Sequence, residues 1–379
     1  MNAEATGAGA AGAGVTEQVR FCRSDDGTRI AYARHGDGPP LVISTCWLSH
    51  LQFDQQSPVW RHYIEDLGAI STLVRYDERG FGLSDWEVED FSFERRIADL
   101  EAVVDAAGLD TFALLGMAQG GQVAIAYALR HPQRVTRLIL NSASATKLTS
   151  DEDVAMEEAF TQLIRVGWAR PESEFRRVFT SLMIPGATPE QMEWLDDLQR
   201  VATSTENAIR FREARRDIDV TDLLPQLDLP TLVVQGRDER MNSFAGSRLL
   251  AAHITGARLV GLDSANHILL GDEPAWQVFV SEIKQFLEPY AERLSAAGAA
   301  RSRAADPEAA RQAEAVRSLT PRERDVLRHA AGGQDNEAIA RALSLSTRTV
   351  ERHLQNAYLK LGVTGRSARA AAVAALLSH

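Results

Sequence analysis

Residues 19–140 alternate between short apolar runs and longer segments with helical spacing. The segments 92–108 and 120–132 carry apolar residues three and four positions apart, which is the spacing of one helix face. The runs between and around them are short, apolar and strand-like, and lie at 39–45, 70–77, 112–117 and 137–142. Alternating strands and helices predict an α/β fold with a mostly parallel sheet and helices on both of its faces.

Residues 147–228 follow a different pattern, because helical spacing continues there without a strand-like run. Thr188 precedes Pro189, as is typical of the start of a helix. Two strand-like runs and a closing helix follow at 229–236, 257–263 and 274–287. We therefore predict an α/β domain over 19–288 in which residues 147–228 form a helical cap.

Segments of biased composition flank this domain. Residues 1–18 are rich in Gly and Ala and lack the basic and apolar regions of a signal peptide, so we expect a disordered tail. Residues 289–316 are rich in Ala, Arg and Glu and are predicted to be a linker, partly helical but broken near Gly298 and Pro307. Residues 317–379 show helical patterns only and predict a small all-α module.

Charge is divided unevenly between these parts. The net charge is −11, with +5 in residues 316–379 and −16 in the residues before them. A basic module on an acidic domain indicates that the C-terminal part meets a polyanion. No run of 18 apolar residues predicts a membrane span, so we expect a cytoplasmic protein. The two cysteines lack the spacing of metal ligands, and we expect neither a metal nor a cofactor.

The stretch "LLGMAQGG" has the frame of a turn that carries a nucleophile. That frame, G-x-S-x-G, follows a strand and opens a helix, so that the central serine is exposed at the end of the sheet. Here the central residue is Ala118, which has no nucleophilic atom. Downstream, Asp238 follows a predicted strand and His267 lies in a predicted loop. This is the order in which an acid orients the imidazole of a catalytic triad.

These motifs, with the segments 47–67 and 74–94, make residues 20–287 resemble the α/β-hydrolase superfamily, and in particular hydrolase-like domains fused to bacterial regulators. The resemblance implies that Ala118 stands where a serine is expected. It also implies oxyanion-hole donors at the backbone N–H of Gln119 and near Trp47–Leu48. The candidate ligand-binding residues are Trp47, Leu48, Met117, Gln119, Trp168 and Trp194. Pockets of this kind are largely apolar, and an ester or lactone is the expected small-molecule ligand.

The alanine at position 118 has two possible origins. The serine was lost naturally, or it was replaced by engineering in order to trap a ligand. Loss of a triad serine lowers turnover by about six orders of magnitude. Retention of Asp238 and His267 favours a recent or engineered change. Three functions therefore stay open: a ligand sensor, an ester or lactone hydrolase altered at position 118, and an interaction scaffold with a filled pocket.

The C-terminal segment contains successive helix starts. Thr320 with Glu323 three positions later predicts a capping box. Asn336 is predicted to cap a second helix, and Ser346 or Thr347 a third. The whole of 317–379 resembles the LuxR-type helix-turn-helix domain.

The third predicted helix of this segment has a basic, amide-rich face opposite its apolar stripe. Such a face fits the major groove of double-stranded DNA. The candidate DNA-binding residues are Thr347, Arg348, Thr349, Glu351, Arg352, Gln355, Asn356 and Lys360. The resemblance implies that the positions around Glu351, Arg352 and Gln355 read bases, and that the last helix forms a homodimer. The sequence thus predicts a transcriptional regulator with a hydrolase-like sensor domain.

Overall fold

The computed structural model describes residues 17–44, 47–147, 151–172, 174–305, 314–365 and 367–377. The chain divides into two compact units, Met1–Ala291 and Glu292–His379. The predicted tail lies mostly outside the described residues. Its last two positions, however, belong to the first unit, because Gln18 begins a strand and the buried Glu17 carboxylate pairs with Arg75 at 2.6 Å.

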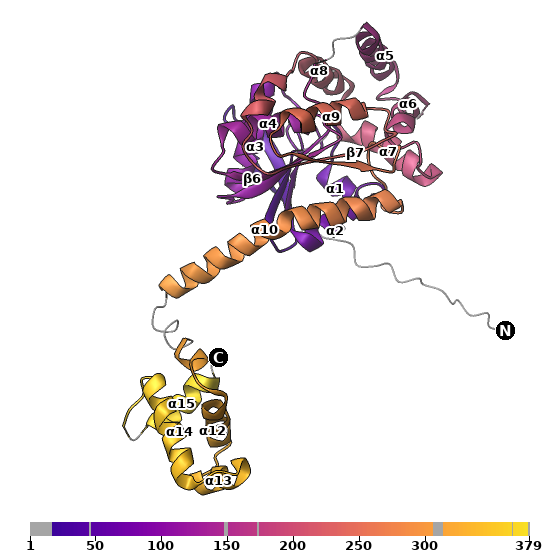
Figure 1. Cartoon of the computed structure of the whole chain (residues 1–379). Helices are drawn as coiled ribbons and strands as arrows, with labels where there is room; N and C mark the ends of the chain where they lie inside the picture. The colour runs from indigo at the N-terminus through magenta and orange to yellow at the C-terminus, as the bar shows by residue number, and fades with distance from the viewer. Residues whose placement is uncertain are drawn as a thin grey trace, which may run out of the picture. The chain divides into compact units, whose positions relative to one another are not determined.

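The first unit is built on an eight-stranded sheet in the order β1-β2-β4-β3-β5-β6-β7-β8 (Figure 1). β1 and β2 run antiparallel to their neighbours, and the other strands are parallel. The strands are β1 (Gln18–Arg23), β2 (Arg29–His35), β3 (Pro40–Ser44), β4 (Thr72–Tyr76), β5 (Phe112–Met117), β6 (Val135–Asn141), β7 (Thr231–Gly236) and β8 (Arg258–Leu262). The predicted mostly parallel α/β fold is confirmed.

Helices cover both faces of this sheet. Side chains alternate along the central strands, so that Leu41 and Ile43 of β3 face one apolar core and Val42 faces the other. The first core includes α2 (Arg61–Ile70) and the start of α10 (Pro274–Ala305). The second core includes α3 (Phe93–Ala106), α4 (Gly120–Arg130) and α9 (Phe244–His253).

Helix α10 extends well beyond its predicted end at residue 287. It passes through Pro289 and Gly298 and ends at Ala305, so the first part of the predicted linker is helical. The predicted break near Gly298 is wrong, and Pro307 lies outside the described residues.

The segment between β6 and β7 forms the predicted helical cap. Its elements are α5 (Asp151–Gly167), α6 (Glu174–Met183), α7 (Pro189–Ala202), α8 (Thr205–Arg215) and the 3-10 turn η1 (Thr221–Gln226). Thr188 caps α7 as predicted, because its hydroxyl accepts the N–H of Gln191 while the Gln191 side chain accepts the N–H of Thr188.

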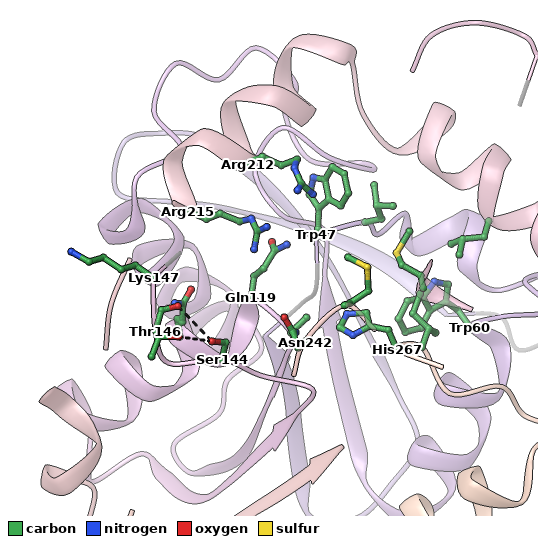
Figure 2. A pocket seen from close by; sticks show the side chains of 17 residues that line it. Trp47, Trp60, Gln119, Ser144, Thr146, Lys147, Arg212, Arg215, Asn242 and His267 are labelled. Carbon is green, nitrogen blue, oxygen red and sulfur yellow. Dashed lines mark hydrogen bonds between the residues drawn. The ribbon is translucent and has the colours of Figure 1, made fainter. Parts of the chain in front are cut away.

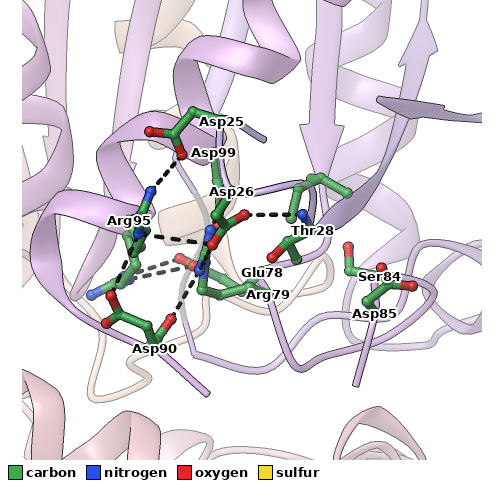
Figure 3. Close-up of polar contacts among 12 residues, drawn as sticks. Asp25, Asp26, Thr28, Glu78, Arg79, Ser84, Asp85, Asp90, Arg95 and Asp99 are labelled. Carbon is green, nitrogen blue, oxygen red and sulfur yellow. Dashed lines mark hydrogen bonds and ion pairs between the residues drawn. The ribbon is translucent and has the colours of Figure 1, made fainter. Parts of the chain in front are cut away.

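The loop after β4 joins the sheet to the cap. Buried Arg79 forms a bidentate ion pair with Asp99, at 2.6 and 2.7 Å (Figure 3). The next carbonyl, Gly80 O, accepts hydrogen bonds from Thr203 Oγ1 at 2.7 Å and Asn207 Nδ2 at 3.1 Å. Through these hydrogen bonds the loop contacts the start of α8. Removing either Arg79 or Asp99 would leave a buried charge without its partner, at a cost of about 3–5 kcal/mol.

The second unit contains α12 (Pro321–Ala331), α13 (Asn336–Leu343), α14 (Thr347–Lys360) and α15 (Ala368–Leu377) around a small apolar core. The predicted capping box of Thr320 and the cap at Ser346 are confirmed. The predicted cap at Asn336 is wrong. Asp335 takes that position and accepts the N–H of Ala338 at 2.8 Å, whereas Asn336 is the first helical residue.

Candidate functional site

Ala118 forms a strained turn between β5 and α4. Its backbone is left-handed, with a φ of 48°, a conformation that costs a non-glycine residue roughly 1–2 kcal/mol. Its N–H donates to Asn141 O at 2.9 Å. The turn also requires glycine, since a Cβ on Gly116 would lie 2.6 Å from the Cα of Gly121. This is the strand–turn–helix geometry expected of a nucleophile turn.

His267 is paired with a buried carboxylate. Its Nδ1 lies 2.6 Å from Oε1 of Glu239, whose side chain is fully buried. The same carboxylate accepts hydrogen bonds from Ser142 Oγ at 2.7 Å and from the N–H of Asn242 at 3.0 Å. With Nδ1 donating to Glu239, the unprotonated nitrogen of a neutral imidazole is Nε2. This arrangement can orient His267 as a general base.

The structure contradicts the predicted pairing of His267 with Asp238. Asp238 is exposed, and its backbone N–H donates to Ser264 O at 3.2 Å. The two acids are neighbours after β7, and only Glu239 turns inward. The sequence placed an acid at the end of this strand but gave no signal as to which of the two faces the histidine.

Ala118 and His267 line one cavity beneath the cap (Figure 2). Among the predicted ligand-binding residues, Trp47, Leu48 and Gln119 also line it. Its other lining residues are Trp60, Gln122, Ser144, Thr146, Lys147, Met183, Leu195, Arg212, Arg215, Met241, Asn242 and Ile268. The cavity therefore combines an apolar wall with polar groups, as in small-molecule sites.

Three predicted ligand-binding residues do not line this cavity. Met117 lines a separate, smaller cavity. Trp168 is buried behind Trp47, with ring centroids 5.4 Å apart. Trp194 stacks on Phe53, with ring centroids 4.7 Å apart. Both tryptophans therefore pack in the apolar core of this unit and do not line the cavity.

The sequence also gave no indication that Arg212 and Arg215 line the cavity. They lie on α8, in an arginine-rich stretch that is typical of an exposed helix face. Arg212 is instead 2% exposed, and burial, followed by the nearby Arg215, lowers its pKa to about 10. Its guanidinium is charged at neutral pH.

In the second unit, α14 presents the predicted DNA-binding face. The residues exposed on it are Thr347, Arg348, Glu351, Arg352, Gln355, Asn356 and Lys360. Thr349 is half-buried, with its hydroxyl 2.7 Å from Ser346 Oγ. Lys360 differs from the expectation, because its ammonium donates to Glu323 at 2.7 Å and to Ser318 O at 3.2 Å. It ties α14 to the start of α12.

Helix α15 buries part of its run of small residues. Ala368, Ala372 and Ala375 are buried, whereas Ala370 and Ala374 are exposed and Leu377 is 73% exposed. An exposed face with small residues therefore remains on this helix, and its role in a homodimer stays a prediction.

Comparison with known proteins identifies both parts of the chain. Residues 39–179 match the alpha/beta hydrolase fold family, and residues 317–373 match the bacterial regulatory proteins of the luxR family. Within the described ranges, no helix has the length and apolar composition needed to cross a membrane.

Three relatives illustrate the first match. The chain is 33% identical over 178 residues to a pimeloyl-acyl carrier protein methyl ester esterase of Neisseria meningitidis, covering 45% of this chain and 68% of the esterase. It is 26% identical over 243 residues to the AB hydrolase superfamily protein YisY of Bacillus subtilis, covering 61% of this chain and 86% of that protein. A crystal structure of a hydrolase from Pseudomonas aeruginosa aligns with a TM-score of 0.59 at 25% identity, covering 71% of this chain and 98% of that one.

Proposed function

Because the chain belongs to the α/β-hydrolase superfamily and carries a LuxR-type DNA-binding domain, we propose that it is a transcriptional regulator whose hydrolase-fold domain binds a small molecule without cleaving it. One observation carries this proposal. Ala118, on its strained turn, lines the same cavity as His267, which pairs with Glu239, so a histidine and its acid face a position that has no nucleophilic atom.

The cavity supports an ester or lactone as the ligand. Ala118 and His267 are the positions at which a hydrolase would handle a carbonyl, and Gln119 begins α4, at the positive end of that helix. Relatives of this chain include a methyl ester esterase. A carbonyl oxygen near the backbone N–H of Gln119 would be held there without reaction.

The exposed face of α14 supports binding in the major groove of DNA, with Arg352 and Gln355 among the side chains available to base edges. We expect two copies of the chain to bind paired half-sites about one helical turn apart. The exposed Leu377 at the end of α15 is available for contact between copies, unlike the buried alanines of that helix.

The experiment measures the affinity of the full-length protein for a DNA site selected from a random duplex pool, with and without short-chain esters and lactones. A regulator binds an ester intact, and the bound ester changes the affinity for DNA. Arg352→Ala serves as the control that weakens DNA binding and keeps ester binding. Ester binding that leaves DNA affinity unchanged would contradict the proposal.

The intact His267–Glu239 pair favours a second function, an ester or lactone hydrolase in which position 118 has been changed from serine. Ala118→Ser is expected to restore turnover in either case, so the two functions differ in the response of DNA binding. For the hydrolase, DNA affinity is indifferent to the ester. The codon at position 118 in the source gene distinguishes a natural alanine from an introduced one.

A further inference from the structure

Two arginines of the cap share a single carboxylate. Arg212 and Arg215 lie on α8, and both donate to Oε2 of Glu157 on α5, the Arg215 bond being 3.1 Å long. Both arginines line the cavity, whereas Glu157 does not. Two positive charges therefore face one negative charge, and a surplus of about one positive charge is left at the two arginines. Lys147 also lines the cavity, but its ammonium points away from both arginines in Figure 2.

Aromatic rings surround the guanidinium of Arg212. Its Cζ atom lies 4.9 Å from the ring centroid of Trp47, 5.4 Å from that of Phe160 and 5.6 Å from that of Phe179. Cation–π contacts of this kind stabilise a cation through its faces. They leave the N–H groups at the edge of the guanidinium available to donate hydrogen bonds, to Glu157 or to a ligand. The rings hold Arg212 in place and exclude water from its faces.

Several residues that line this cavity carry a buried donor atom without a hydrogen-bond partner among the described residues. They are Nε of Arg212, Nε of Arg215 and the indole nitrogens of Trp47 and Trp60. Unsatisfied buried acceptors are fewer here, namely Oε1 of Gln119 at the cavity and Oε1 of Glu157 behind it. Buried polar groups are normally paired, so an excess of donors indicates a ligand that supplies acceptor oxygens.

Figure 2 shows the guanidinium groups of Arg212 and Arg215 near Trp47 and Gln119, with His267 further along the cavity. In this view His267 therefore lies further from the two arginines than Gln119 does. A ligand that reaches both His267 and the arginines has an acyl group at one end and an anionic group at the other.

We propose that the ligand of this cavity is a carboxylate-bearing ester or lactone, with its free carboxylate held by Arg212 and Arg215. This inference rests on the proposed function, because it names the ligand class of the same site. Arginine binds carboxylates through parallel N–H donors. The surplus of about one positive charge matches a single carboxylate better than a phosphate dianion.

The experiment compares matched ligands that differ only in the carboxylate. Monomethyl esters of straight-chain dicarboxylic acids, the corresponding dimethyl esters and methyl phosphate are titrated into the full-length protein, with tryptophan fluorescence as the signal because Trp47 and Trp60 line the cavity. We expect the best monomethyl ester to bind about 10- to 100-fold more tightly than its dimethyl ester, since hydrogen bonds to charged groups contribute about 1.5–3 kcal/mol.

Arg215→Gln should remove most of this difference, because it weakens binding of the monomethyl ester far more than binding of the dimethyl ester. The Arg215 side chain is 22% exposed, so Arg215→Gln is expected to fold. Arg212 is buried, and replacing it is expected to destabilise the cap. Arg210→Gln is the matched control, because Arg210 lies on the same helix, is 46% exposed and pairs with Glu206 outside the cavity.

The outcomes separate the two proposals. Equal affinity for the monomethyl and dimethyl esters would overturn the inference and leave the ligand-binding function standing. Tighter binding of methyl phosphate, lost in Arg215→Gln, would overturn the assignment to a carboxylate. Absence of binding by the whole ester series would overturn the inference together with the ester as ligand in the proposed function. Where an ester does bind, its effect on DNA affinity tests the regulator separately.

Discussion

Restoring a hydroxyl at position 118 is the sharpest test of the site. Ala118→Ser adds one oxygen to a residue that is 7% exposed and already adopts the left-handed backbone of a nucleophile turn. Serine and alanine both carry a Cβ, so the backbone strain is the same for each. We expect the free energy of unfolding to change by less than about 1 kcal/mol, as for most substitutions that neither bury a charge nor open a cavity.

The expected gain in activity follows from the retained pair. A catalytic serine acts with a histidine that takes its proton, and the acid holds the imidazole in the correct tautomer. Removing a triad serine costs about six orders of magnitude in turnover. The 2.6 Å contact between His267 and Glu239 is present without the serine, so most of that factor should return in Ala118→Ser.

The assay is hydrolysis of a chromogenic short-chain ester, with fluorophosphonate labelling of residue 118 as the second readout. In the Ala118→Ser background, Glu239→Gln should lower turnover about 10⁴-fold, as expected when the triad acid is made neutral. Asp238→Asn is the matched control, and since Asp238 is exposed it should change turnover less than about threefold.

Two results would refute this reasoning. A folded Ala118→Ser protein that neither reacts with fluorophosphonate nor cleaves any ester would show that the donors around position 118 are out of place. A loss of activity in Asp238→Asn, with Glu239→Gln unaffected, would show that the wrong carboxylate was assigned to His267.

Three further predictions concern stability and DNA binding. Burial raises the pKa of Asp54 to about 7, against a partly compensating Arg75, so the folded state retains a proton that the unfolded state releases near pH 4. The free energy of unfolding should therefore fall between about pH 4 and pH 7, by at most about 4 kcal/mol, and denaturant titrations should find this slope missing in Asp54→Asn. Asp335→Ala should destabilise the C-terminal unit by about 1 kcal/mol in thermal unfolding, and Asn336→Ala by less, since only Asp335 caps α13. Arg352→Ala should weaken binding to the selected DNA site by about 1–3 kcal/mol in anisotropy titrations, and an unchanged affinity would remove it from the reading face.

Hydrophobic periodicity was sufficient to predict the central sheet and the cap, because buried parallel strands are nearly continuous apolar runs. It did not reveal β1 and β2. β1 lies at the edge of the sheet and has mostly exposed or half-buried residues, so its apolar signal is weak. Helix α10 extends beyond its predicted end, since neither Pro289 nor Gly298 interrupts it.

The site was predicted less completely, because side-chain direction in loops is not encoded in periodicity. The sequence placed an acid after β7 but could not distinguish Asp238 from Glu239, two neighbours that face opposite ways. It likewise could not distinguish a buried arginine from an exposed one on α8. Arg212 is buried because Trp47, which is far from it in the sequence, packs against its guanidinium, and this contact exists only in the folded domain.

The strained backbone at Ala118 also determines what a single mutation of the gene could produce. Every alanine codon becomes a serine codon by changing its first base, so position 118 is a single mutation away from a nucleophile. That mutation would meet a turn already bent for it and a histidine already paired with Glu239. On the proposed function, a population carrying this gene is one base change away from hydrolysing the molecule that the protein binds, and growth selection on an ester as sole carbon source is a direct way to observe that change.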